Sequence, residues 1–144
     1  MSVSAMVAAK YLASKSGWTL SNLEIQKILY IAQMFHLGRH GAPLIDEPFE
    51  AWDYGPVQPK LYHELKMFGR KPVQNIFHGV RDVPTGSDEL KTLEEAYESL
   101  HKAGPARLIH ATHRPGGAWE RNYEPGRRNR LIPPEDLVAE FQRL

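Results

Sequence analysis

The chain has 144 residues and no cysteine, so it is long enough for one domain with an apolar core, and it has no disulfide, thiolate nucleophile or thiolate metal site. Its 18 basic and 17 acidic residues leave a formal net charge of +1, which excludes a global field that would attract nucleic acid or an acidic membrane. No apolar run approaches the ~20 residues that span a bilayer, and the N-terminus lacks a basic leader, which together predict a cytoplasmic protein.

The N-terminal segment has the pattern of a short amphipathic helix. Ser4 can cap this helix, and Gly17 follows its expected end at about Ser16. Its apolar side chains recur at the i, i+1, i+4 and i+5 positions that form one helical face. They are Val7, Ala8, Tyr11 and Leu12.

The second predicted helix is the most apolar and is expected to be central. It begins at a capping box, in which the Ser21 hydroxyl and the Glu24 carboxylate satisfy backbone amides reciprocally, and it ends at Gly38 or Gly41. Apolar residues lie on most of its sides, which predicts that other elements surround it. They are Ile25, Ile28, Leu29, Ala32 and Phe35 on the core face, and Ile31, Met34 and Leu37 elsewhere.

The pattern becomes extended after this helix. Pro43 and Pro48 disfavour a helix, and residues 49–54, Phe-Glu-Ala-Trp-Asp-Tyr, alternate between two faces with period two. We therefore predict a short strand-like arm or a small β-hairpin, with Trp52 and Tyr54 on the same face.

The rest of the chain predicts more helices, so the expected fold is mainly α: a single helical domain, residues 1–144, around the central helix. Residues 71–86 are irregular, with a small strand pair as one interpretation. Residues 114–130 are rich in Gly, Pro, Arg and Asn and lack periodicity, which predicts a long surface loop. The further helices are expected from Pro59 to Gly69, from Ser87, from Gly104-Pro105 and from Pro133-Pro134.

Aromatic and arginine side chains are the candidates for partner contacts. The two large aromatics of the arm either pack into the core or form a recognition surface, because both roles suit such rings. The arginines and aromatics of residues 114–130 suit an acidic protein partner, nucleic acid or a solvated loop. The candidate partner-binding residues are Trp52, Tyr54, Arg114, Trp119, Arg121, Tyr123, Arg127 and Arg128.

A polar stripe follows the central helix. Gln26, Tyr30 and Gln33 lie at i, i+4 and i+7, away from the core face. This stripe is either solvated or semi-buried, or it is a polar seam that orients residues 53–54.

Two histidine pairs have spacings known from helical metal sites. His36 and His40 are four residues apart, and His110 and His113 are three apart. A tetrahedral site needs three or four ligands, and nothing in the sequence brings the pairs together. We therefore interpret them as helix-end histidines bonded to carbonyl groups or water, and we expect no metal and no cofactor.

The sequence contains no recognisable catalytic arrangement. It has no Gly-x-Ser-x-Gly elbow, no Gly-rich phosphate loop and no dinucleotide-binding Gly-x-Gly-x-x-Gly. Adjacent acid pairs such as Glu94-Glu95 fall where loops, exposed helix faces or first turns favour charge. The prediction is a protein that is not an enzyme.

Three blocks of the chain resemble the Panacea domain family of phage-associated and SocA-like antitoxins. The family's Leu-Gln-Lys-Leu-Leu-Tyr motif is similar to Ile-Gln-Lys-Ile-Leu-Tyr at residues 25–30. Its Phe-Glu-Ala-Trp-x-Tyr-Gly-Pro-Val motif matches residues 49–57, and its Thr-His-x-x-x-x-x-Trp ending is similar to residues 112–119. The second of these motifs is the most specific.

The resemblance implies an antitoxin that neutralises a cognate protein toxin by direct contact. In the SocA-like branch, such a protein is a proteolytic adaptor that delivers its toxin to the ClpXP protease. The alternative from a different class is a phage-associated regulator that binds nucleic acid through the arginines of residues 114–130. Because those charges are a local cluster in a chain of balanced charge, nucleic acid is the less favoured partner.

Overall fold

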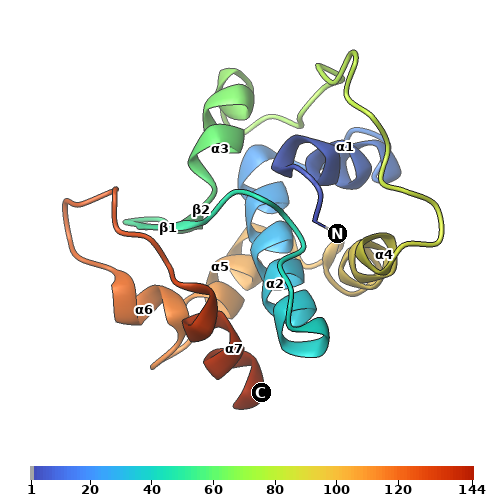
Figure 1. Ribbon diagram of the computed structural model, residues 1–144. Helices are drawn as coiled ribbons and strands as arrows, with labels where there is room; N and C mark the ends of the chain where they lie inside the picture. Colours follow the sequence, from blue (N-terminus) through green and yellow to red (C-terminus); the bar gives the residue numbers. More distant parts are fainter. Residues whose placement is uncertain (1) are drawn as a thin grey trace.

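The computed structural model describes residues 2–144 and is built around one long helix. This helix, α2 (Asn22–His40), runs through the middle of the molecule, with α1, α4, α5 and α7 packed against it (Figure 1). It is the predicted central helix, and Ile25, Ile28 and Leu29 are completely buried. The predicted fold class, mainly α with a small hairpin, is confirmed.

Local chemistry sets both ends of α2. Ser21 Oγ accepts a hydrogen bond from the Glu24 amide at 3.2 Å, and the Glu24 carboxylate accepts one from the Ser21 amide at 3.1 Å, so the predicted capping box is present. The helix ends at Gly41, whose φ of 69° is left-handed. Gly38 lies inside the helix, where a Cβ would fall 2.1 Å from the Phe141 ring, so its small size lets α7 approach closely.

The N-terminal segment pairs with the chain that follows α2. Helix α1 (Ala5–Lys15) is capped by Ser4, which accepts a hydrogen bond from the Val7 amide. Before it, the Val3 amide donates to the Leu44 carbonyl and the Asp46 amide donates to the Val3 carbonyl, both at 2.9 Å. The predicted first helix is thereby confirmed, and it is tied to the segment that leads into the arm.

The predicted arm is a β-hairpin. Strands β1 (Glu50–Trp52) and β2 (Gly55–Val57) are antiparallel, with Trp52 opposite Gly55 and a tight turn at residues 53–54. The prediction that Trp52 and Tyr54 share a face is wrong, because the turn ends the alternation at Trp52. The Trp52 side chain is 3% exposed and that of Tyr54 is 68% exposed.

A short helical segment and an irregular stretch follow the hairpin. Gln58 caps α3 (Pro59–Leu65) by accepting a hydrogen bond from the Leu61 amide at 2.7 Å. The single 3₁₀ turn η1 (Lys66–Phe68) continues it. Residues 71–86, all of which the structure describes, form no strand pair, so that interpretation is wrong and the irregular one is correct.

The C-terminal half contains four helices, of which three pack against α2 and the short α6 packs against α7 and β1. Residues 114–130 are not wholly a loop as predicted, because five of them form a helix that is too short to show a periodicity. These helices are α4 (Asp88–Leu100), α5 (Gly104–Thr112), α6 (Ala118–Asn122) and α7 (Pro134–Gln142).

The apolar core is continuous and lies between α2 and its neighbours. Phe49 packs edge-on against the Tyr30 ring with centroids 5.3 Å apart, and this contact joins the arm to the core. None of the helices within residues 2–144 combines the length and the apolar character that a membrane-spanning helix requires.

Candidate partner-binding site

The polar stripe of α2 is a buried seam that holds the arm. Gln26 Oε1 accepts a hydrogen bond from the Gln58 amide at 2.8 Å, and Gln26 Nε2 donates to the Gln58 carbonyl at 3.2 Å. Gln33 Oε1 accepts from the amides of Leu44 and Ile45 at 2.7 and 3.0 Å. Because these side chains are buried, the solvated interpretation of the stripe is wrong, and α2 holds both ends of residues 44–58 through hydrogen bonds.

Lys27 adds a buried positive charge to this seam. Its side chain is 2% exposed, and its ammonium donates to the Pro56 carbonyl at 3.0 Å. Burial lowers the pKa of Lys27 from its ordinary value to about 8, because an apolar environment disfavours the charged form. No carboxylate among the described residues pairs with this ammonium, which is unusual for a buried charge.

Gly55 lets Lys27 and His113 approach the hairpin. A Cβ on Gly55 would lie 2.7 Å from His113 Cε1 and 3.1 Å from Lys27 Nζ, and the φ of 114° at Gly55 is itself a conformation that glycine tolerates best. Burial lowers the pKa of His113, the hydrogen bond to the Ile109 carbonyl opposes this shift, and the charge of Lys27 adds to it. His113 is therefore a neutral neighbour of the ammonium at physiological pH.

The third sequence block meets the hairpin directly. Trp119 Nε1, on α6, donates a hydrogen bond to the Trp52 carbonyl at 2.8 Å. The Trp119 ring also contacts His113, with centroids 4.1 Å apart, and stacks on Tyr123. The Tyr123 hydroxyl donates to Asp53 Oδ1 at 2.7 Å, and this bond raises the pKa of Tyr123. Residues about 70 positions apart in the sequence thus form one surface.

The predicted arginines lie on this surface or beside it, and several are paired with acids. Arg128 lies over the Trp52 ring, with its guanidinium carbon 4.5 Å from the centroid, and covers this side chain. Arg127 and Arg130 both contact Glu124, at 3.0 and 3.1 Å.

The other two predicted arginines are exposed near α7. Arg121 lies 3.8 Å from Asp136, and Arg114 lies in a small pocket with Arg143.

Of the eight predicted contact residues, most are therefore accessible and one is not. Trp52 is buried under Arg128 and against Tyr62, whose ring centroid is 5.1 Å away. Trp119 and Tyr123 are partly exposed and bonded to the hairpin. The exposed members are Tyr54, Arg114, Arg121, Arg127 and Arg128.

Glu140 is a positioning residue that the sequence analysis missed. Its Oε1 accepts a hydrogen bond from the buried Ala118 amide at 2.7 Å, so a carboxylate of α7 holds the first turn of α6. A Cβ on Gly117 would lie 2.6 Å from this oxygen, which leaves room only for glycine. Burial, and then the charge of Glu140, raise the pKa of Tyr30. A lone Glu on an amphipathic helix carries no signal of such a role.

A groove beside the hairpin was also missed. It has a volume of about 620 Å³ and lies between the first turns of α2, the hairpin and α3. Lys27, Trp52 and Tyr54 line it, together with Tyr62 and Arg70. Only the tertiary structure brings these residues together, because they come from elements far apart in the sequence.

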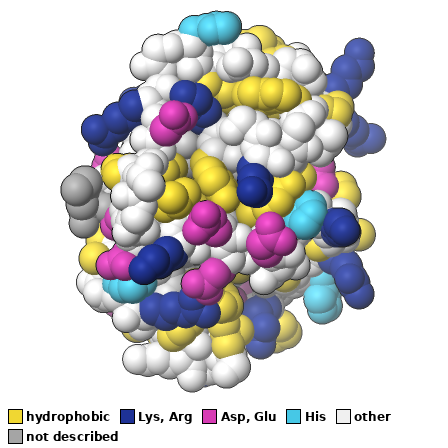
Figure 2. Space-filling view, turned by 90° about the vertical axis from the view of Figure 1, so that its right-hand side faces the viewer, with side chains coloured by type: hydrophobic (Ala, Val, Ile, Leu, Met, Phe, Trp, Pro, Cys, Tyr) yellow, Lys and Arg dark blue, Asp and Glu magenta, His cyan; other side chains and the backbone are white. Residues whose placement is uncertain are grey.

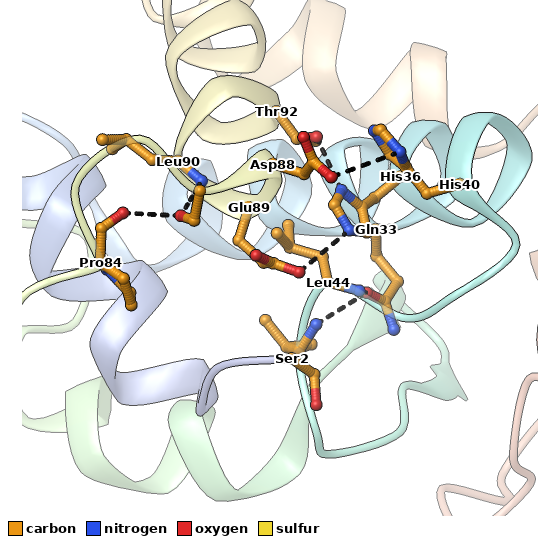
Figure 3. Close-up of polar contacts among 12 residues, drawn as sticks. Ser2, Gln33, His36, His40, Leu44, Pro84, Asp88, Glu89, Leu90 and Thr92 are labelled. Carbon is orange, nitrogen blue, oxygen red and sulfur yellow. Dashed lines mark hydrogen bonds and ion pairs between the residues drawn. The ribbon is translucent and has the colours of Figure 1, made fainter.

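The first histidine pair lies away from this surface, between α2 and α4 (Figure 3). His36 Nδ1 lies 2.7 Å from Thr92 Oγ1 and its Nε2 lies 3.5 Å from Glu89, while His40 Nδ1 lies 4.0 Å from Asp88. Burial, followed by the proximity of His40, lowers the pKa of His36, and Glu89 opposes that shift. His36 is thus a core residue, contrary to the helix-end interpretation.

The second pair fits the helix-end interpretation in part. His113 ends α5 and its Nδ1 lies 2.6 Å from the Ile109 carbonyl, whereas His110 is exposed. Within residues 2–144 no cluster of three or more histidine and acidic side chains has the arrangement of a metal site.

The comparisons with known proteins agree with these motifs. Residues 25–120 match the family described as "Antitoxin SocA-like, Panacea domain". The chain is also 29% identical over 131 residues to the protein named Antitoxin SocA of Caulobacter vibrioides, an alignment that covers 83% of this chain and 70% of that protein. No solved structure matches the chain significantly.

Proposed function

Because the chain belongs to the SocA-like antitoxin family that contains the Panacea domain, we propose that it binds a cognate toxin and neutralises it by direct protein contact. The single observation that carries this proposal is that the third sequence block, with Tyr123 just after it, joins the second block in one surface through the Trp119–Trp52 and Tyr123–Asp53 hydrogen bonds. The first block holds the hairpin in place, because Gln26 donates a hydrogen bond to the Gln58 carbonyl and Lys27 donates one to the Pro56 carbonyl.

The exposed side chains of this surface suit protein recognition. Tyr54 and Arg128 belong to the residue types that dominate binding hot spots, and both are accessible. Trp52 and Trp119 contribute by holding the surface in shape, since the ring of one is covered and the indole N–H of the other is bonded to the hairpin. We propose no covalent chemistry for the chain, in keeping with a family of antitoxins.

The proposal is tested by co-expressing the chain with the product of the neighbouring gene. We expect this product to be retained on the wild-type chain, and Tyr54→Ala or Arg128→Ala to weaken its affinity at least about tenfold, as loss of a hot-spot side chain does. Met67→Ala and Arg81→Ala are the matched controls, because both residues are exposed and lie outside the surface. If the neighbouring gene product is not retained on the wild-type chain at all, the antitoxin proposal is wrong.

A second, separable proposal is that the chain delivers the bound toxin to ClpXP. Its support is the resemblance to the SocA-like branch and the similarity to Antitoxin SocA. The test is the degradation rate of the purified toxin by ClpXP with and without this chain. An unchanged rate rejects the adaptor role and leaves neutralisation by binding untouched.

A further inference from the structure

The charged side chains that line the groove beside the hairpin are all positive. Lys27 and Arg70 are the charged residues that line it, and no acidic side chain does. Arg70 is exposed, and among the described residues neither cation has an ion-pair partner. On the side of the molecule that carries α4, by contrast, acidic and basic side chains are interspersed (Figure 2).

The missing counter-charge matters most at Lys27. A buried ammonium is normally compensated by a carboxylate, because transfer from water into an apolar environment is costly. Here the Pro56 carbonyl is the acceptor in its hydrogen bond, and His113 of α5 is the titratable group that faces it. The first residues of α2 also line the groove, and the N-terminal end of a 19-residue helix adds partial positive charge there. Glu24, which does not line the groove, offsets part of it.

The walls of the groove are aromatic. The Trp52 and Tyr62 rings meet edge-on and form one wall, and Tyr54 stands 68% exposed at the tip of the hairpin. A volume of about 620 Å³ falls within the range of sites that take small ligands or a few side chains. A complementary occupant therefore combines at least one carboxylate with an apolar or aromatic group.

We propose that this groove receives an acidic segment of the partner polypeptide, with an Asp or Glu carboxylate facing Lys27 and Arg70 and an apolar side chain against the rings of Tyr54 and Tyr62. The inference rests on the proposed function, since it names the chemistry of the toxin segment that the chain binds. A polypeptide suits the groove better than nucleic acid because two cations supply few of the phosphate contacts that nucleic-acid affinity needs.

The test uses the toxin encoded by the neighbouring gene, both intact and as overlapping 12-residue peptides that cover its sequence. Binding to the full chain is measured by titration calorimetry for the toxin and by fluorescence anisotropy for the peptides. We expect the tightest peptide to carry a net negative charge. Arg70→Glu is expected to lower the affinity for the toxin and for the tightest peptide at least about tenfold, because it replaces an attraction with a repulsion.

Arg81→Glu is the matched control, since it makes the same charge change at an exposed position outside the groove, and its effect is expected to stay below about twofold. Lys27→Met should weaken binding like Arg70→Glu. Because Lys27 is buried, thermal unfolding must first show that this variant folds. If it does not, Arg70→Glu and Tyr54→Ala, both at exposed positions, still decide the question.

The outcomes separate the inference from the proposed function. Undiminished toxin binding by Arg70→Glu and Tyr54→Ala overturns the groove inference and leaves the antitoxin proposal standing. A neutral or basic tightest peptide also overturns it, as does displacement of the peptides by a ten-nucleotide oligothymidylate at physiological salt, which would assign the groove to nucleic acid. If the intact toxin does not bind the wild-type chain, both proposals fail.

Discussion

At the scale of single residues, Lys27 is a charge that folding has to bury. Its ammonium has one hydrogen bond, to the Pro56 carbonyl, in surroundings that lower its pKa to about 8. The charged form therefore weakens the folded state at neutral pH. A methionine of similar length would fill the same space at no electrostatic cost, so we attribute the buried charge to the binding role proposed for Lys27 above.

The stability of the chain should depend on pH through this residue. Between pH 8 and pH 10.5 the unfolded state keeps a proton that folded Lys27 has lost, so the free energy of unfolding should rise with pH across this window. A pKa about 2.5 below the ordinary value corresponds to about 3 kcal/mol. Denaturant unfolding at pH 7, 8, 9 and 10 should show this rise relative to Lys27→Met. Parallel profiles for the two proteins would contradict the assignment.

Gly55, the glycine of the hairpin, should tolerate substitution poorly. Gly55→Ala adds a methyl group 2.7 Å from His113 and 3.1 Å from Lys27 at a φ of 114°, and we expect a loss of about 2–4 kcal/mol in the free energy of unfolding. Gly79→Ala is the control, because φ is also positive there at 80° but no atom lies within 4 Å of the new Cβ. It should lose about 1 kcal/mol. Equal losses would mean that backbone strain alone sets the cost.

At the scale of secondary-structure elements, α6 depends on its neighbours. Five residues are too few to form a stable helix alone, so its position comes from tertiary bonds. Glu140 of α7 binds the amide at one end, and Trp119 binds the hairpin. The orientation of the third sequence block is therefore set jointly by α7 and the arm.

Glu140→Ala should loosen this arrangement. It leaves the buried Ala118 amide without its acceptor, which costs about 1–3 kcal/mol. Amide hydrogen exchange at residues 118–123 should accelerate in this variant. Glu135→Ala, an exposed acid in the first turn of the same helix, should leave exchange at these residues unchanged. Unchanged protection in Glu140→Ala would show that Trp119 alone holds α6.

The sequence predicts those elements whose signals are local. The Ser4 and Ser87 caps and the capping box of α2 are read within four residues of chain, and their predicted helices are confirmed. Helix α6 was not predicted within residues 114–130, because it is held by a carboxylate 22 positions away in the sequence. The position of Tyr54 was predicted wrongly because a two-residue turn resets the alternation of a strand.

The candidate site was only partly predictable for the same reason. Sequence motifs identified the hairpin and Trp119 as important, and the structure brings them into contact. The groove was not predictable, because Tyr62 and Arg70 belong to no motif and meet Lys27 only after folding. Likewise, Trp52 is of a residue type that is common at binding surfaces, and only the packing of Arg128 over its ring shows that it is covered.

At the scale of the whole molecule, charge balance argues against nucleic acid as a partner. The net charge is +1, Arg121 is paired with Asp136, and Arg127 and Arg130 share Glu124. We expect no retardation of a 30-base-pair duplex or an oligothymidylate at 150 mM salt, and only weak, steeply salt-dependent binding at 50 mM. Retention of binding at 150 mM salt would revive the nucleic-acid regulator as a function.

Residues 130–132 cover the outer edge of β1, and this has a consequence for truncation of the chain. The Ala51 amide donates to the Arg130 carbonyl and the Ile132 amide donates to the Phe49 carbonyl, so residues 130–132 occupy the position of a third strand. Without them, β1 would be an exposed edge strand with unpaired backbone N–H and C=O groups, the kind of edge through which proteins aggregate. A version that stops after α6 should therefore self-associate, and shortened fragments are a poor substitute for the intact polypeptide in any binding experiment.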